Sequence, residues 1–428
     1  MKLGLGLGFS SSAHTLLSEI FTLPLGFDWS PSFAITKQSG HYKTDLDVPS
    51  FAPTGQAYYV DPVSGSDGNV GTEIAPFKSV RTAMNASNAV EIYLKAGAVF
   101  LRDTWTGYGA YNPPRDMSFK TYGGTDRCYL TTAQHALSWS LQTGTTYRVS
   151  RTNTKNVIDR ADTHSDGAAK LLAYKASIEE VDLNPGSWWT NGTLVYVHTF
   201  DSRVPDSDIM VMVDVPNLVV TGDKDMYFEN IEFWGGDYPL GYNVSNGTKH
   251  CVLNNCAVRY GAVADGLTIR DVDRLSLIKS DFTDNFEDGV NIRTNGSTIV
   301  KTLEVDCYYA RNGLNDADNI NNGSTYHTGC LGIRLNCHSE DNKGPLLADS
   351  DVGTQSINLN CTATNSAHAL STDVGNAGFF VQNSAEMWLK DCSASGSYYD
   401  RSVNSAGVIY DLGGFSGDGL DNGSVTLL

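Results

Sequence analysis

The chain has 428 residues, of which 41% are hydrophobic and 18% charged, and its formal net charge is −18. This apolar share is enough for a sizeable core and excludes a disordered chain, while the acidic balance excludes a protein that binds a nucleic-acid phosphate backbone. No run of 18 apolar residues occurs in the sequence, so no membrane-spanning helix is predicted. Low charge combined with 42 glycines is typical of an all-β, turn-rich chain.

Residues 1–56 have few charges and poor periodicity, which predicts an extended arm that docks on something else. The first residues, MKLGLGLGF, resemble the beginning of a signal peptide, but glycines interrupt the apolar stretch and no small-residue cleavage site follows. We therefore expect a chain that is made in the cytoplasm and is not processed by a cleaved signal.

Residues 57–127 are predicted to form a cap and the first coils of a solenoid, with a helix over 76–87 that covers its open end. Such a cap is needed because an uncovered terminal coil exposes strand edges and core. Residues 128–224 interrupt the repeat described below and contain three tryptophans, which predicts an inserted β subdomain.

A repeat of about 25 residues runs through the second half of the chain. Five cysteines each directly follow an Asn or Asp, and an apolar residue comes shortly before that Asn or Asp, as in LNNC, EVDC, RLNC, NLNC and LKDC. These are Cys256, Cys307, Cys337, Cys361 and Cys392. Ile231 and Asp281 are expected in the same phase without the sulfur. No C-x-x-C pair occurs, so a zinc site is not predicted.

Short strands recur with this period. The word DGLTIR at 265–270 returns as DGVNIR at 288–293, and apolar side chains alternate with polar ones in both. Strands of this length separated by Asn-Gly and Asp-Gly turns predict a parallel β-helix over 225–410, followed by a Gly-rich tail at 411–428. The five cysteines should then stack in the interior, buried and reduced, because cysteine is readily buried as a small apolar group.

Words in the first half carry a family resemblance. YYVD (58–61), GSDGNVGT (65–72), EIYLKAGAVF (91–100) and FKTYGG (119–124) resemble the first coils of the pectate-lyase-like right-handed β-helix superfamily. The resemblance covers roughly 57–410 and implies an all-β, right-handed parallel β-helix. It does not specify an activity, because the superfamily includes lyases, hydrolases, epimerases, phage tail spikes and inactive binders.

The order of arm, β-helix and Gly-rich end is most similar to a phage tail spike or tail fibre protein. This resemblance implies a homotrimeric virion protein, made in the host cytoplasm, whose arm attaches to phage tail or baseplate proteins. It also implies binding, and in some members cleavage, of bacterial surface polysaccharide. Two alternatives stay open: a non-catalytic structural or binding solenoid of the virion, and a bacterial polysaccharide lyase or hydrolase.

Four carboxylates are the catalytic candidates. Asp265 and Asp288 share a repeat phase, so they are expected one coil apart, where repulsion raises one pKa and creates an acid/base couple suited to a retaining glycosidase. The alternative is that each Asp-Gly only turns the chain into its strand. Asp284 and Glu287 lie beside Asp288 and would suit either a weak Ca²⁺ site or a solvated acidic turn. No other metal or cofactor is predicted.

Arg270 and Arg293 are expected to point outward on successive coils, where they could grip the carboxylates of an acidic sugar or neutralise the nearby aspartates. His327 is expected on a lengthened turn. There it could contact the substrate, act as a general base, or be a plain surface residue.

Two tyrosine pairs are further candidates for substrate binding. Each pair follows a cysteine of the repeat and precedes an arginine, as in CYYAR and GSYYDR: Tyr308 and Tyr309, and Tyr398 and Tyr399. Exposed aromatic rings with polar tips suit stacking on sugars, and they suit a contact between protomers equally well.

Overall fold

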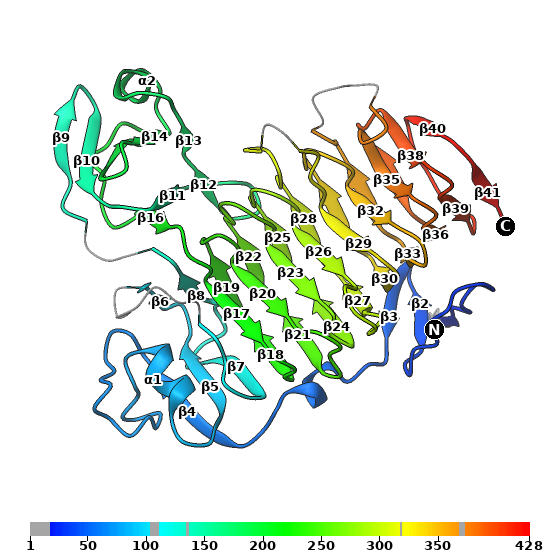
Figure 1. The fold of residues 1–428 in the computed structure, drawn as a ribbon, viewed down its shortest axis with the longest axis horizontal. Coiled ribbons are helices and arrows are strands. Elements are labelled where there is room, and N and C mark those ends of the chain that lie inside the picture. The colour runs from blue at the N-terminus through cyan, green and yellow to red at the C-terminus, as the bar shows by residue number, and fades with distance from the viewer. Residues whose placement is uncertain (1–17, 103–110, 134–136, 317–318, 368–372) are drawn as a thin grey trace, which may run out of the picture.

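The structure, a computed structural model, describes residues 18–102, 111–133, 137–316, 319–367 and 373–428. It is a right-handed parallel β-helix with three parallel sheets, and each regular coil contributes one strand to each sheet (Figure 1). The sheets are numbered here in the order in which the chain passes through them within a coil. None of the helices in the described ranges is long and apolar enough to cross a membrane.

Sheet 1 has twelve strands, which are β4 (Gln56–Val60), β5 (Ala89–Lys95), β7 (Met117–Tyr122), β18 (Met226–Glu229), β21 (His250–Asn254), β24 (Arg274–Ile278), β27 (Lys301–Val305), β30 (Leu331–Leu335), β33 (Gln355–Leu359), β36 (Glu386–Lys390), β39 (Val408–Asp411) and β41 (Val425–Leu427). Sheet 2 has nine, which are β6 (Val99–Phe100), β8 (Cys128–Thr131), β19 (Ile231–Trp234), β22 (Ala257–Arg259), β25 (Asp281–Thr283), β28 (Tyr308–Ala310), β31 (His338–Glu340), β34 (Thr362–Thr364) and β37 (Ser393–Ser395). Sheet 3 also has nine, which are β17 (Leu218–Thr221), β20 (Leu240–Asn243), β23 (Leu267–Arg270), β26 (Val290–Arg293), β29 (Ser324–His327), β32 (Leu347–Ser350), β35 (Ala377–Gln382), β38 (Tyr399–Val403) and β40 (Leu420–Asn422).

The corner between sheet 1 and sheet 2 explains the repeated cysteine words. Seven corners, from Asn230 to Asp391, each contain one residue in the left-handed conformation, with φ between +50° and +59°. At five of them this residue comes directly before a cysteine of the repeat; at the other two it comes before Ile231 or Ser280. Asn and Asp tolerate this conformation better than other residues with a side chain. The next residue then points into the core, which is why an Asn or Asp precedes the buried cysteine.

All eight cysteines are buried and free, so the prediction of a reduced interior column is confirmed. The strand register corrects one member of the column. Ala257 pairs with Asp281, so Cys256 lies opposite Ser280 in the next coil, and Ser280 rather than Asp281 occupies the column. Cys128 is a further member, since it pairs with Ile231. Lys279 takes the left-handed corner there, which hides the shift from a search for Asn or Asp.

Helix α1 (Val80–Asn85) lies within the range 76–87 predicted for a capping helix. The hydroxyl oxygen of Ser79 accepts a hydrogen bond from the backbone N–H of Thr82, which begins the helix. Val80, Ala83 and Met84 turn inward and join the main core of the β-helix. The helix therefore packs beside β4 and β5 on the first coils (Figure 1).

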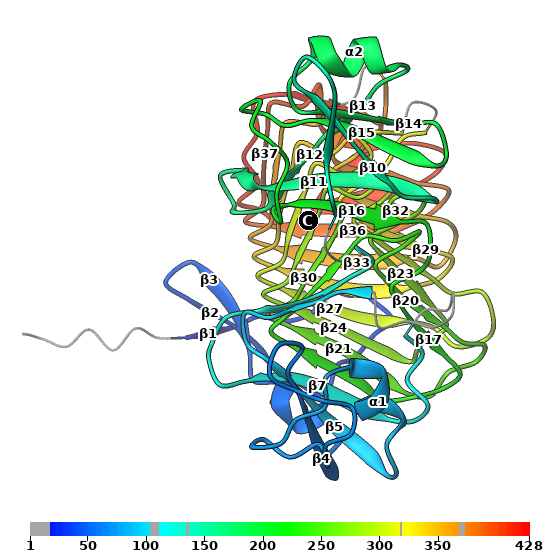
Figure 2. The ribbon, with the colours of Figure 1, turned by 90° about the vertical axis from the view of Figure 1, so that its left-hand side faces the viewer.

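The predicted inserted subdomain, residues 128–224, contains strands of two kinds. β8 and β17, at its two ends, pair with strands of the β-helix, while the strands between them form separate, mainly antiparallel sheets. These are β9 (Ser140–Thr143), β10 (Thr146–Ser150), β11 (Thr154–Thr163), β12 (Ala169–Leu171), β13 (Ala173–Tyr174), β14 (Ser187–Thr190), β15 (Leu194–His198) and β16 (Ile209–Val213), with helix α2 (Ile178–Leu183). Figure 2 shows α2 and α1 on opposite sides of the first coils.

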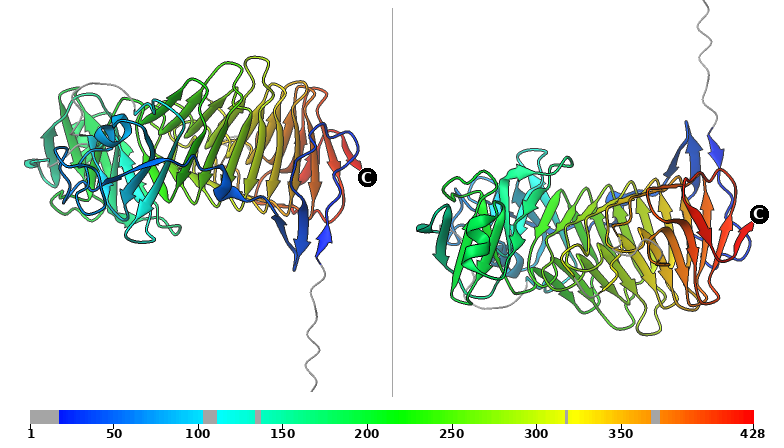
Figure 3. Two further views of the ribbon diagram at one scale, coloured as in Figure 1. Left: turned by 90° about the horizontal axis from the view of Figure 1, so that it is seen from below. Right: turned by 90° about the horizontal axis from the view of Figure 1, so that it is seen from above.

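The described part of the predicted arm runs along the outer face of sheet 1 (Figure 3). Its elements are β1 (Glu19–Ile20), β2 (Ile35–Gln38), β3 (His41–Thr44) and a 3₁₀ turn (Val48–Phe51). Ile35 and Tyr42 are buried there in a cluster with Ile333, Ile357 and Trp388. The arm thus docks on its own β-helix over this range, and residues 1–17 lie outside the described residues.

Removing residues 1–51 is expected to lower the melting temperature and to expose the apolar outer face of sheet 1, which would then bind hydrophobic dyes. Each large apolar side chain uncovered costs about 1.5–3 kcal/mol of burial. Thermal unfolding and dye binding of the truncated and the full-length chain check this, and equal melting temperatures for both would contradict it.

Candidate functional site

Polar side chains gather on the outer face of sheet 3. Along β23 and β26, Leu267, Ile269, Val290 and Ile292 face the core, so the alternating residues face outward. Register pairs the outward side chains of successive coils, with Thr268 opposite Asn291 and Arg270 opposite Arg293. The next strand continues both columns with Thr325 and His327.

Asp265 and Asp288 come two residues before β23 and β26, one coil apart as predicted. A single amide joins them, because Nδ2 of Asn291 lies 3.4 Å from Oδ1 of Asp265 and 3.4 Å from Oδ2 of Asp288. The hydroxyl of Thr268 also donates to Asp265 at 2.9 Å. The backbone N–H of Asn322 donates to Asp288 at 2.6 Å. The two carboxyl groups therefore form a couple that is held in place from both coils.

The pKa values of this couple are raised. Burial raises the pKa of Asp288 to about 8, with further contributions from the charges of Asp265 and Glu287. Burial also raises the pKa of Asp265, but Arg270 and the hydrogen bonds from Thr268 and Asn291 act in the opposite direction. At neutral pH the couple therefore holds a proton, and Asp288 is the site that favours it.

The four predicted carboxylates do not converge. Glu287 is half-exposed beside the couple, and its pKa is raised to about 7 by burial and by the charges of Asp265 and Asp316. Asp284 instead turns to the other side of the turn, where its two oxygens lie 2.9 Å from Nε and Nη2 of Arg311. Asp284 is therefore paired with a cation and directed away from the couple, so the structure does not bring the carboxylates of this segment together.

Across the described ranges, no three His, Cys, Asp or Glu side chains are grouped so as to hold a metal ion.

The basic column crosses the site beside the acids. Nη1 of Arg270 donates to Oδ1 of Asn291 at 3.1 Å, so the same amide connects the carboxyl couple to this arginine. His327 lies one strand beyond Arg293, and its Nδ1 is 3.6 Å from Asp351. Burial and the two arginines lower the pKa of His327 to about 4, so this imidazole is neutral at physiological pH.

Of the predicted tyrosines, one pair lies away from the site. Tyr309 is fully buried inside the β-helix and donates to Glu304, so its predicted contact with substrate is wrong. Tyr308 lies on sheet 2, where its ring stacks on that of His338 with centroids 5.7 Å apart. The two tyrosines are neighbours in one strand, and successive side chains of a strand point to opposite faces of the sheet, so only one of the two reaches the surface.

The second tyrosine pair lies on the side of sheet 3. Tyr399 begins β38 and packs against the cluster of Ala348, Ala377 and Phe380. Tyr398 is 37% exposed, and the two rings meet edge to face with centroids 4.7 Å apart.

A cavity of about 170 Å³ opens on the same face and was not predicted. Its wall includes Ala348, Val374 and Phe380, and its rim includes His327 and Asn322. Ile320 and Val374 come from the two long turns that connect sheet 2 to sheet 3. Register columns of sheet 3 could have identified Asn291, Asn322 and Thr325, whereas the course of long turns has no comparable sequence pattern.

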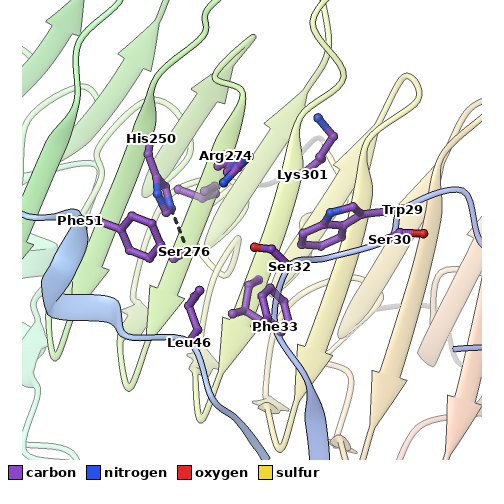
Figure 4. A pocket seen from close by; sticks show the side chains of 12 residues that line it. Trp29, Ser30, Ser32, Phe33, Leu46, Phe51, His250, Arg274, Ser276 and Lys301 are labelled. Atoms are coloured by element: carbon purple, nitrogen blue, oxygen red, sulfur yellow. Dashed lines mark hydrogen bonds between the residues drawn. The ribbon is translucent and has the colours of Figure 1, made fainter. Parts of the chain in front are cut away.

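A second cavity, of about 180 Å³, lies between the arm and sheet 1 (Figure 4). Trp29 and Phe33 of the arm face His250, Arg274 and Lys301 across it. Both cations contact Asp273, Arg274 at 3.4 Å and Lys301 at 3.1 Å, so their charge is compensated in place. We therefore take the face of sheet 3, and not this cavity, as the candidate site.

No protein-family model matches the sequence, and no curated protein matches it. Among solved structures, the chain is similar to XylC, described in complex with xylose, at 12% identity and a TM-score of 0.55, over 85% of this chain and 70% of that one. It is also similar to pectate lyase Pel9A, at 13% identity and a TM-score of 0.46, over 89% of this chain and 79% of that one. The tailspike protein gp49 from Pseudomonas phage LKA1 matches at 12% identity and a TM-score of 0.24, over 81% and 70%. At these identities the likeness concerns the fold alone.

Proposed function

We propose that this protein binds a polysaccharide along the outer face of sheet 3 and hydrolyses a glycosidic bond at Asp265 and Asp288. The observation that carries the proposal is the buried carboxyl couple, in which one amide joins the two acids and burial raises the pKa of Asp288 to about 8. Carboxyl pairs whose environments give them different protonation states are the usual machinery of glycoside hydrolysis.

The two acids would take different roles. Asp288, protonated at neutral pH, donates its proton to the glycosidic oxygen as the bond to the anomeric carbon breaks. Asp265, on which Arg270 and the donors Thr268 and Asn291 oppose the effect of burial, attacks the anomeric carbon in its ionised form on a path through a covalent intermediate. Water then releases the sugar with Asp288 as general base. Glu287, half-exposed with a pKa of about 7, is the next proton donor beside them.

The biological setting that we propose is a phage tail spike or tail fibre. The arm, the β-helix and a glycan-binding face suit a virion protein that attaches to bacterial surface polysaccharide as a homotrimer and to tail or baseplate proteins through its N-terminal arm. A bacterial polysaccharide lyase or hydrolase is the alternative setting. The low exposure of the acids, 5% for Asp265 and 6% for Asp288, favours a second function, in which the same face binds glycan without cleaving it.

Release of reducing ends from purified bacterial surface polysaccharides tests the hydrolase. We expect Asp265→Asn to lower the rate by about 10²–10⁴-fold, as is typical for the loss of one essential acid or base, with little change in folding. Asp273→Asn, on the face of sheet 1, is the matched control and should keep the wild-type rate. Unsaturated products would identify a lyase, and wild-type binding without release would favour the non-catalytic function.

A further inference from the structure

We propose that the polysaccharide carries carboxylate groups, and that Arg293 and His327 hold one of them while its sugar ring occupies the neighbouring cavity on sheet 3. This inference rests on the proposed function, because it names the class of glycan that the same face would take. It is carried by an arginine without a partner, by a column of basic groups, and by the position of the cavity.

Arg293 is the first observation. Within the described residues, its guanidinium makes no hydrogen bond and no ion pair, and its Nε atom is buried without a partner. Most other half-buried arginines of the chain are paired: Arg311 holds Asp284 and Asp166, and Arg401 holds Asp411 and Asp421. Since the Nε atom of Arg293 is buried, a ligand would reach the two Nη atoms, which also make no hydrogen bond within the described residues.

The second observation is the placement of positive charge. Arg293 lies opposite the charged Arg270 on the neighbouring strand, at about 4.8 Å, and the neutral imidazole of His327 follows on the next strand. Like charges directly opposite one another on a sheet are unfavourable unless something compensates them. Asp265 lies beside Arg270 and Asp351 beside His327, but no acid lies within ion-pair distance of Arg293 in the described part of the chain.

The cavity is the third observation. His327 belongs both to the basic column and to the cavity rim, so a group held by Arg293 lies next to the opening. Ala348, Val374 and Phe380 give it an apolar wall, and Ser350 and Gln382 continue the polar column along its edge. A pyranose ring has the matching character, with an apolar C–H face and hydroxyl groups around its rim.

A carboxylate fits this arrangement better than a neutral hydroxyl group. The planar guanidinium presents two parallel N–H donors, which match the two oxygens of a carboxylate. The protein as a whole carries a net charge of −18, so it repels an acidic polymer except where cations are concentrated. Uncompensated charge at Arg293 is what such a polymer would need in order to bind here.

Binding of uronic-acid polymers tests the inference. The probes are polygalacturonate, alginate and hyaluronate, each paired with its carboxyl-reduced form, which keeps the sugar ring and the linkage but lacks the charge. We expect at least one acidic polymer to bind tenfold or more tightly than its reduced form. Arg293→Gln should weaken that binding by about 10- to 100-fold, the usual effect of losing a charge-assisted pair, and should leave binding of the reduced form unchanged.

Arg274→Gln, which removes an arginine from the face of sheet 1, is the matched control and should bind as the wild type does. Equal binding of acidic and reduced polymers, an equal loss for both in Arg293→Gln, or tighter binding of dextran sulfate than of every uronate would overturn the inference. If the wild type binds a neutral polysaccharide and no uronate, the inference fails while the proposed function stands. If it binds no polysaccharide at all, both fail. Circular dichroism confirms that each variant is folded.

Discussion

Asp288→Asn is expected to abolish hydrolysis and at the same time to stabilise the fold above pH 7. Burial raises the pKa of the carboxyl group from its ordinary value of 3.8 to about 8 in the folded chain. Between these two pH values the unfolded chain releases this proton while the folded chain keeps it. The folded state then binds more protons, so its stability falls as pH rises from about 4 to about 8.

Asparagine does not titrate, so the variant loses this pH-dependent penalty. Since one pKa unit corresponds to about 1.4 kcal/mol, the gain in unfolding free energy should be at most about 6 kcal/mol at pH 8 and vanish near pH 4. Urea unfolding at pH 4, 6 and 8 measures the difference, and reducing-end release measures the lost activity, expected to be about 10²–10⁴-fold.

Asp284→Asn provides the contrast, because Asp284 is equally buried but paired with Arg311. The variant removes one of the two carboxylates that hold Arg311 and leaves only Asp166 beside it, so it should be less stable than the wild type at pH 8. A destabilised Asp288→Asn at pH 8 would show that this carboxyl group is ionised in the folded chain, and it would remove the proton donor from the proposed mechanism.

Arg334→Met is expected to cause the largest loss of stability, about 3–5 kcal/mol. Arg334 is completely buried inside the β-helix, where its guanidinium lies 3.5 Å from Glu304, 3.2 Å from Asp349 and 3.7 Å from the ring centre of Tyr326. Methionine fills a similar length but leaves two buried acids without their cation. Because removing one partner costs more than removing the whole group, Arg334→Met combined with Glu304→Gln should recover part of the loss.

Arg274→Met, an exposed arginine on the same sheet, should change the unfolding free energy by less than about 0.5 kcal/mol. Denaturant unfolding at pH 7 compares the three variants with the wild type. A loss in Arg334→Met no larger than that in Arg274→Met would mean that the buried acids are neutral and need no cation.

The β-helix could be predicted because its periodicity appears directly in the sequence. An Asn or Asp in the left-handed corner, followed by a buried cysteine, marks each coil, and alternation in the DGLTIR and DGVNIR words marks sheet 3. The same phase brought Asp265 and Asp288 together. The assignment of the column by this pattern was wrong at Ser280, because Lys279 takes the left-handed conformation there and lysine is not a residue type that indicates it.

The rest of the site depends on packing between segments that are distant in sequence. Asp284 turns to Arg311 because that partner lies across the turn. The path of the arm over sheet 1 follows from apolar contacts such as Tyr42 with Trp388, whose match no local pattern encodes. The same is true of the cavity, whose wall is assembled from long turns.

The left-handed residue at each of the seven corners from Asn230 to Asp391 keeps that edge of these coils at nearly one length. The connections from sheet 2 to sheet 3 differ widely, from 284–289 to 311–323 and 365–376, and Glu287, Ile320 and Val374 from them lie beside the acids or the cavity. Insertions and deletions at this edge leave the stacking of the coils intact. The scaffold can therefore diversify its ligand preference by exchanging loops along one ridge, and chimaeras with loops grafted there should keep the parent's core and melting behaviour.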